Sequence, residues 1–207
     1  MKITNEDNME LMARYPDNYF DLAIVDPPYG YGTKKTGILN FRMEAKEKEW
    51  NTAPTLEYFT ELIRVSKNQI VWGGNYFSCL WELGGRCFIY WHKGNPVPNF
   101  ADGELAWTSF DRNAKQFDYR YYGNLEGKTS ASDKFHPTQK PVALYKWLLD
   151  KYAKPNDKIL DTHLGSGSIA IACHDYGFDL TACELDKEYF DKAMQRINNH
   201  VAQQKLF

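Results

Sequence analysis

Residues 158–184 read KILDTHLGSGSIAIACHDYGFDLTACE, and they predict a strand, a glycine-containing loop, a helix and a second strand. Short apolar runs lead into Asp161 and Glu184 and have the length of buried strands. The helical pattern of Ser168–Tyr176 ends at Gly177, a residue type that favours helix C-termini. This order of elements is typical of a mostly parallel sheet that is covered by helices.

The same alternation extends over the whole chain of 207 residues, for which we expect a single α/β domain spanning residues 1–207. The expected strands are Met1–Asn5, Leu22–Asp26, Asn68–Trp72, Arg86–Trp91, Leu105–Ser109, Lys158–Thr162 and Leu180–Glu184. Further helices are expected at Thr55–Lys67, at Thr138–Tyr152 with Pro141 in its first turn, and from an N-cap near Asp186. The fourth and fifth strands have no helix between them, which predicts an antiparallel hairpin at one sheet edge.

Composition excludes several classes of protein. The net charge is −2, so any affinity for nucleic acid must come from local basic surface. The four cysteines form no C-x-x-C pair and no histidine stands at zinc-finger spacing, so we expect reduced thiols and no metal site. The first residues lack an apolar signal region, and no apolar run approaches the roughly 20 residues that span a bilayer. These features predict a soluble cytoplasmic protein without a membrane partner.

The loop Gly165-Ser166-Gly167 predicts a ligand site, because glycine lets the backbone approach a ligand closely. Glu184 ends the next strand about 20 residues further on, where an acidic side chain accepts hydrogen bonds from ribose hydroxyls. The spacing Gly165-x-Gly167-x-x-Ala170 also fits a dinucleotide site, so a nicotinamide-dependent oxidoreductase stays open. Asp161 favours S-adenosylmethionine, since a carboxylate attracts its cationic amino-acid moiety and would repel a pyrophosphate.

A second motif, Asp26-Pro27-Pro28-Tyr29, follows the strand Leu22–Asp26, and strand carboxyl ends are where such sheets bind ligands. The motif suits methylation of an aromatic amino group, whose nitrogen becomes a better nucleophile when both N–H bonds are held by acceptors. Asp26 and the carbonyl of Pro27 supply two acceptors, and the two prolines stiffen the loop. Tyr29 offers a flat face to a base drawn out of the duplex. An ordinary tight turn is the competing interpretation of the tetrapeptide.

These residues, together with three further stretches, resemble the β-class DNA amino-methyltransferases over nearly the whole chain. The further stretches are Val71–Asn75, Tyr90–Asn95 and His136–Pro141, and a short helix is expected within Asn5–Tyr29. The resemblance implies a Rossmann-like methyltransferase sheet of seven strands, with a circularly varied motif order in which the catalytic motif precedes the cofactor motif.

The resemblance also implies a set of cofactor contacts. Residues expected to contact S-adenosylmethionine are Asp7 near its adenine, Thr138 and Lys140 near its methionine end, and Asp161, His163, Gly165, Ser166, Gly167 and Glu184. His163 stands where the family commonly has a phenylalanine that packs on the cofactor, and we expect it to stack similarly.

An aspartate at the start of the catalytic motif favours adenine N6 over cytosine N4, and cytosine N4 is kept as the alternative. Protein-glutamine methylation fits less well because the order of the two motifs is reversed. A catalytically silent DNA-binding subunit also stays open.

Two long irregular stretches are expected beside the site, a mobile loop at residues 30–54 and a short DNA-recognition insert at residues 111–135. The first holds Lys34, Lys35, Arg42, Lys46, Lys48 and Trp50, and the second holds Arg112, Lys115, Phe117, Tyr119, Arg120, Tyr121, Tyr122, Lys128 and Lys134. Basic groups there suit phosphates and the aromatic rings suit bases, which predicts double-stranded DNA as partner. Solvated loops whose aromatic rings turn inward are the competing interpretation. A homodimer, a cognate restriction nuclease and a bacterial or phage origin are further hypotheses.

Overall fold

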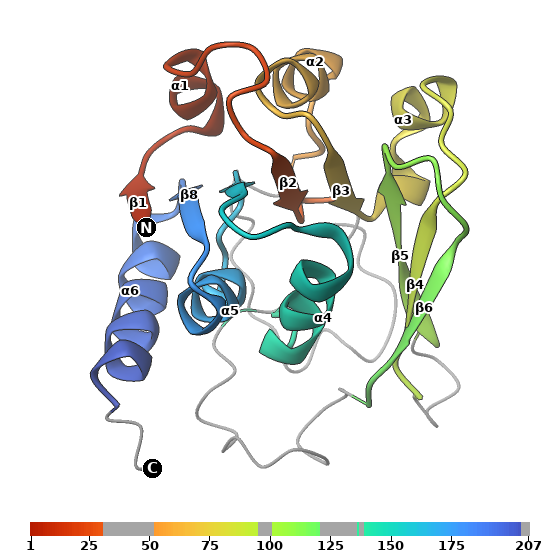
Figure 1. The fold of residues 1–207 in the computed structure, drawn as a ribbon. Coiled ribbons are helices and arrows are strands. Elements are labelled where there is room, and N and C mark those ends of the chain that lie inside the picture. The colour runs from red at the N-terminus through yellow and green to blue at the C-terminus, as the bar shows by residue number, and fades with distance from the viewer. Residues whose placement is uncertain (31–51, 95–100, 121–135, 137–138, 204–207) are drawn as a thin grey trace, which may run out of the picture.

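The computed structural model describes residues 1–30, 52–94, 101–120, 136 and 139–203, and they form an eight-stranded sheet with helices on both faces (Figure 1). The strands are β1 (Lys2–Asn5), β2 (Leu22–Val25), β3 (Gln69–Trp72), β4 (Phe88–His92), β5 (Gly103–Thr108), β6 (Lys115–Asp118), β7 (Lys158–Asp161) and β8 (Asp179–Glu184). The helices are α1 (Asn8–Ala13), α2 (Leu56–Val65), the 3-10 turn η3 (Gly74–Tyr76), α3 (Ser78–Glu82), α4 (Val142–Tyr152), α5 (Ser168–Tyr176) and α6 (Lys187–Ala202).

The strands lie in the order β1-β8-β7-β2-β3-β5-β4-β6. Strand β5 runs antiparallel to both of its neighbours, and the remaining pairs are parallel. All seven expected strands are present, and the expected α/β class is confirmed. The chain leaves β2 for β3 on one side and returns to β7 on the other, so the strand order reverses at β2. Ligands of such sheets bind at this reversal, beside the carboxyl ends of the strands.

Strand β6 corrects two expectations. It lies inside residues 111–135, which were predicted to be irregular, and it pairs in parallel with β4. The hairpin of β4 and β5 therefore exists but does not form the edge of the sheet. Strand β6 escaped prediction because three of its four side chains are exposed and only Phe117 is half-buried. The edge strand is held from one side, where Phe117 packs against Trp147 of α4 at a centroid distance of 5.3 Å.

Strand β2 is buried on both faces, as its continuous apolar sequence predicts, and β3 is buried along its whole length as well. Because side chains alternate across a strand, Leu22 and Ile24 join the core under α4, α5 and α6. Ala23 and Val25 point the other way, into the core under α1 and α2. Two apolar layers thus fix β2 in place, which holds the residues that follow it.

Helix ends largely follow the sequence signals. Asp186 caps α6 by accepting from the backbone N–H groups of Glu188 and Tyr189, and Gly177 ends α5 in the left-handed conformation. Pro141 is the N-cap residue of α4 and not part of its first turn, since the helix begins at Val142. The expected short helix after β1 is α1, whereas η3 and α3 were not predicted.

Two of the expectations from composition concern the cysteines and the membrane, and the structure describes residues that bear on both. All four cysteines are free thiols, and three of them are buried. In the described part of the chain, no helix combines the length and the apolar character needed to cross a membrane.

Candidate active site

Four acidic residues follow the carboxyl ends of parallel strands and therefore meet at one edge of the sheet. Asp26 follows β2, Asp161 ends β7, Glu184 ends β8, and Asp7 lies two residues after β1. The topology thus brings the catalytic motif and the glycine loop together, although more than 130 residues separate them in the sequence.

The Asp26 carboxylate is held from both sides. Tyr29 Oη donates a hydrogen bond of 2.8 Å to Asp26 Oδ1, and Lys140 Nζ pairs with Asp26 Oδ2. Burial raises the pKa of Tyr29 well above its usual value, so the phenol keeps its proton and remains a donor. Pro27 is buried and Pro28 is half-buried beside them.

The ring of Tyr29 lies directly against the backbone of Gly73, which follows β3. A Cβ atom on Gly73 would stand 2.1 Å from Tyr29 Cε1, and the φ of Gly73 is +68°. Tyr76 stacks against Tyr29 with a centroid distance of 5.0 Å and an interplanar angle of 28°. Gly73 therefore makes room for Tyr29, whereas Gly74 makes room for Trp107, and sequence reasoning assigned neither role.

Asp26 belongs to a cluster of four buried or half-buried charged residues. Lys140 Nζ also lies 3.1 Å from Glu104 Oε2, and Glu104 pairs in turn with Lys93. Burial alone would raise the pKa of Glu104, but Lys140 and Lys93 outweigh it and lower the pKa to about 2. Burial raises the pKa of Asp26, the Lys140 ammonium opposes this rise, and Glu104 adds to it. Sequence reasoning missed Glu104, which carries no motif signal on β5.

The glycine loop is tied to β8 and packed under α6. The backbone N–H of Gly165 donates to Glu184 Oε2 at 2.8 Å, and Glu184 Oε1 accepts from the N–H of Asp186 at 3.0 Å. Gly167 has a φ of +75°, and a Cβ atom there would lie 2.9 Å from Ile197 Cδ1. The second glycine thus serves the packing of the loop under α6, while the first serves its closure on Glu184.

Ser166 is buried, and its hydrogen bonds connect the glycine loop to α5 and α6. Its hydroxyl lies 3.1 Å from Ser168 Oγ, and its carbonyl accepts from Arg196 of α6 at 2.8 Å. Ser168 Oγ donates to the carbonyl of Lys140 at 2.7 Å, so the loop also contacts the segment that precedes α4.

His163 is half-buried and uncharged. Its Nδ1 atom lies 2.9 Å from Thr162 Oγ1, and its Nε2 atom lies 3.2 Å from Asn8 Nδ2. The ring meets Tyr58 edge-on at a centroid distance of 5.4 Å. Burial lowers the pKa of His163 to about 3, so the imidazole stays neutral at physiological pH. Its expected stacking on the cofactor stays a prediction.

Asp161 is almost fully buried, with 2% of its surface exposed. Its Oδ1 atom accepts from the N–H of His163 at 2.9 Å, yet burial raises its pKa to about 8. Burial also raises the pKa of Glu184. A carboxylate in such surroundings suits a cationic ligand group, whose charge would favour the ionised form.

The remaining predicted contacts are less central. Asp7 caps α1 through the N–H groups of Met9 and Glu10. Thr138 lies outside the described residues, and so do residues 31–51 and 121–135, which contain most of the expected DNA-binding side chains. Tyr119 is described, and it stacks on Phe117 at 5.8 Å. Its contact with DNA stays a prediction.

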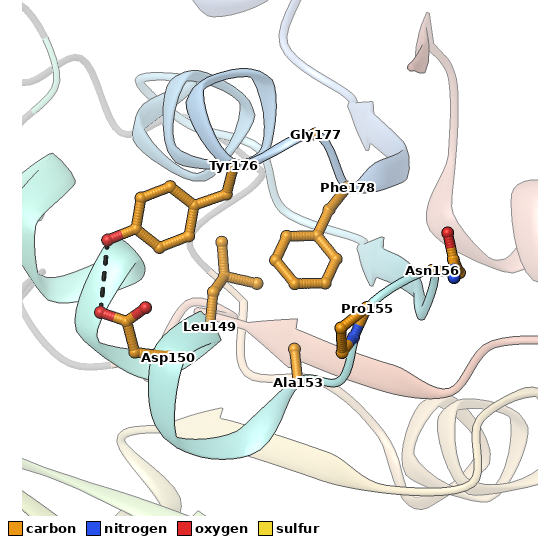
Figure 2. A pocket seen from close by; sticks show the side chains of 8 residues that line it. All are labelled: Leu149, Asp150, Ala153, Pro155, Asn156, Tyr176, Gly177 and Phe178. Carbon is orange, nitrogen blue, oxygen red and sulfur yellow. Dashed lines mark hydrogen bonds between the residues drawn. The ribbon is translucent and has the colours of Figure 1, made fainter.

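A hollow of about 530 Å³ lies away from these residues (Figure 2). The ends of α4 and α5 and the turns before β7 and β8 line it, and Tyr176 donates to Asp150 at 3.2 Å. Because it adjoins the amino ends of β7 and β8, it lies at the opposite edge of the sheet from Asp161 and Glu184. The hollow is therefore no part of the candidate site.

The family model described as DNA methylase, of the N6/N4 methyltransferase type, matches residues 74–195. The chain belongs to this family. It is a DNA amino-methyltransferase of the N6/N4 type, and the match decides against the nicotinamide-dependent alternative.

Known relatives agree with this assignment. The type II methyltransferase M.HinfI of Haemophilus influenzae is 27% identical over 247 residues, which cover 94% of this chain and 67% of that protein. The type II methyltransferase M2.LlaDCHI of Lactococcus lactis subsp. cremoris is 22% identical, covering 95% of this chain and 88% of that protein.

Solved structures share the fold. The complex of M1.HpyAVI with S-adenosylmethionine superposes with a TM-score of 0.63 at 24% identity, covering 94% of this chain and 98% of the other. The cytosine-N4-specific PvuII DNA methyltransferase superposes with a TM-score of 0.64 at 14% identity, covering 96% and 90%. The Rossmann-like methyltransferase fold is thereby confirmed, with eight strands in place of the expected seven.

Proposed function

We propose that this DNA amino-methyltransferase transfers a methyl group from S-adenosylmethionine to N6 of adenine in double-stranded DNA, with Asp26-Pro27-Pro28-Tyr29 as its catalytic segment. The observation that carries the proposal is the position of Asp26, beside the glycine loop and with its carboxylate oriented by Tyr29 and Lys140. An aspartate in the first place of the motif supports adenine.

The residues at the ends of β7 and β8 fit S-adenosylmethionine. Asp161 is a buried carboxylate that the ligand's ammonium group would stabilise, and Glu184 keeps free lone pairs for ribose hydroxyls after accepting two backbone N–H groups. Gly165, Ser166 and Gly167 bring backbone close to the ligand, and Asp7 and His163 flank it. When bound, S-adenosylmethionine supplies a methyl group on a sulfonium that departs as a neutral thioether.

Asp26 and the Pro27 carbonyl hold the two N–H bonds of the target amino group, so that the nitrogen lone pair points away from the ring and toward the methyl donor. Tyr29 gives the flipped base a flat surface, and positioning supplies much of the rate. As the N–C bond forms and the S–C bond breaks, the nitrogen becomes more acidic. The Asp26 carboxylate, as one of the two acceptors of this amino group, would take the proton that the nitrogen releases.

Cytosine N4 is the second candidate, because the cytosine-N4-specific PvuII enzyme shares the fold with a TM-score of 0.64. Expression of the protein in a methylation-free host, followed by sequencing that detects modified bases, separates the two. Modified adenines in a fixed sequence context support the proposal. Modified cytosines alone would establish the second candidate, and unmodified DNA would refute both.

A homodimer and a partner nuclease are proposals of lower rank that concern assembly. The small surface of the expected DNA-recognition insert favours either a pair of copies on DNA or a short target site. Sedimentation of the protein with and without DNA tests the dimer, and a monomer in both conditions would refute it.

A further inference from the structure

Lys140 occupies an unusual place for a lysine. Its side chain is 2% exposed, and its ammonium group lies 5.3 Å from the centre of the Trp72 ring. Lysine is almost never buried this completely unless it is paired, and here the partners are Asp26 and Glu104. Burial alone lowers the pKa of Lys140, but the two carboxylates outweigh it and raise the pKa. The lysine is therefore charged.

The backbone of Lys140 is hydrogen-bonded to the part of the site that contains the glycine loop. The Lys140 carbonyl accepts a hydrogen bond of 2.7 Å from Ser168 Oγ at the start of α5. Arg196 of α6 donates both to Ser168 Oγ at 2.9 Å and to the Ser166 carbonyl at 2.8 Å. Lys140 thus joins the catalytic carboxylate to the glycine loop within a single residue.

The geometry points to Lys140 as a positioning residue for the methyl-transfer step, which orients the Asp26 carboxylate and favours its ionised form while Glu104 and Lys93 balance the charge. The inference rests on the proposed function, because it assigns Asp26 the role of acceptor for the target amino group. It also departs from the expectation that Lys140 serves the methionine end of the cofactor.

Orientation follows from the two contacts of Asp26. Tyr29 holds Oδ1 and Lys140 holds Oδ2, so the carboxylate is fixed against rotation. A carboxylate offers about four lone-pair sites, so each oxygen retains capacity for an N–H group of the base. Without Lys140 one end would be free to turn, and the acceptor would lose its alignment.

The charges around Asp26 influence whether its carboxyl group is ionised. The charged or titratable groups that face it are Tyr29 of its own loop, Lys140 just before α4, Tyr145 of α4, Glu104 of β5 and Asp161 of β7. Lys140 is the cation among these, and it opposes the burial and the repulsion by Glu104, which together raise the pKa of Asp26. Lys93 pairs with the far side of Glu104 and limits that repulsion.

The test compares single-turnover methylation of DNA across pH for the wild type and two variants. Lys140→Met removes the cation, so the pKa of Asp26 rises and the acid limb of the rate profile moves to higher pH by roughly one to three units. At neutral pH its rate falls by roughly 100-fold, whereas the dissociation constants for S-adenosylmethionine and DNA stay within about threefold of the wild type. Glu104→Gln removes the repelling charge, so the acid limb moves to lower pH.

The acid limb thus moves in opposite directions in the two variants if Lys140 positions Asp26. A merely structural ion pair would change the stability of the protein without moving the pH profile of the rate. Lys146→Met is the matched control, since Lys146 lies on α4, which begins two residues after Lys140, and pairs at 2.7 Å with Asp175. It should leave the rate and the pH profile unchanged. Lys140→Arg, which keeps the charge, should recover part of the rate and most of the profile.

The outcomes distinguish the two claims. A wild-type protein that methylates no DNA overturns the proposed function and this inference with it. An active wild type, together with a Lys140→Met variant that keeps its rate and its acid limb, overturns this inference alone. Should Lys140→Met fail to fold, Glu104→Gln decides, because an acid limb that stays or moves to higher pH contradicts the assigned charge balance.

Discussion

Replacing Gly73 by alanine tests whether the backbone after β3 sets the position of Tyr29, the tyrosine of the proposed catalytic segment. The new Cβ atom would stand 2.1, 2.5 and 2.6 Å from three ring atoms of Tyr29. Since ordinary contacts begin near 3.4 Å, the ring must move by more than about 1 Å. Such a movement turns the phenol away from Asp26, to which it donates at 2.8 Å.

The expected cost has two parts. The φ of Gly73 is +68°, and a left-handed conformation costs a non-glycine residue roughly 1–2 kcal/mol. Overpacking against the ring costs about 1–3 kcal/mol more. For a domain of this size the sum of roughly 2–5 kcal/mol lowers the melting temperature by between about 4 and 20 °C. Misplacement by about 1 Å lowers the rate of methyl transfer roughly 100-fold.

Gly84→Ala is a matched control, because Gly84 has a φ of +75° and no atom lies within 4 Å of the point where its Cβ atom would stand. It carries the backbone strain of about 1–2 kcal/mol without the collision. Both variants are compared with the wild type by thermal unfolding and by single-turnover methylation. If Gly73→Ala matched Gly84→Ala in both measurements, the claim that Gly73 positions Tyr29 would be refuted.

Three further substitutions probe the cofactor side of the site. Because burial raises the pKa of Asp161 to about 8, its contribution to stability is complete below the unfolded value of 3.8 and is lost as the pH rises to about 8. Asp161→Asn should therefore flatten the dependence of the unfolding free energy on pH between these two values, as measured by denaturant titration at each pH. An unchanged slope would contradict the claim that burial raises the pKa of Asp161. Glu184→Gln weakens the hydrogen bonds to the Gly165 N–H and to a ribose. We expect calorimetry to show an affinity for S-adenosylmethionine that is roughly 10- to 100-fold lower. Unchanged affinity would remove Glu184 from the site. Asp186→Ala removes the cap of α6 and should lower the free energy of unfolding by about 1 kcal/mol without changing the methylation rate, and a loss of activity would show that the cap has a further role.

Much of the fold could be predicted because local signals agree with the tertiary structure. The run Leu22–Val25 is apolar throughout, and it forms a strand that is buried on both faces. Gly177 and Asp186 mark helix ends through backbone conformation and capping, which depend on one or two residues. Strand β6 had no such signal, since three of its side chains face solvent and its pairing with β4 is a long-range interaction.

The residues of the candidate site likewise include some that local signals predict and some that they do not. Motifs predict Asp26, Asp161, Gly165 and Glu184 as site residues, because the residue type of each and its place near a strand end indicate its chemistry. Glu104 was missed because it belongs to no motif and gains its role only from the antiparallel strand that brings it to Lys140.

Lys140 itself was noticed in the sequence, but its partners were not. Burial and pairing of charges arise from tertiary packing, so the link from Lys140 to Asp26 emerges only in the folded chain.

The central claim is that Asp26 enables methylation of adenine N6, and nucleoside analysis after reaction in vitro tests it most directly. Unmethylated double-stranded DNA is incubated with labelled S-adenosylmethionine and either the wild type, Asp26→Ala or the surface variant Asp17→Ala, and the labelled nucleoside is identified after digestion. We predict N6-methyladenine with the wild type and with Asp17→Ala, and no labelled nucleoside with Asp26→Ala. Label on cytosine alone, or undiminished labelling of adenine by Asp26→Ala, would contradict the account.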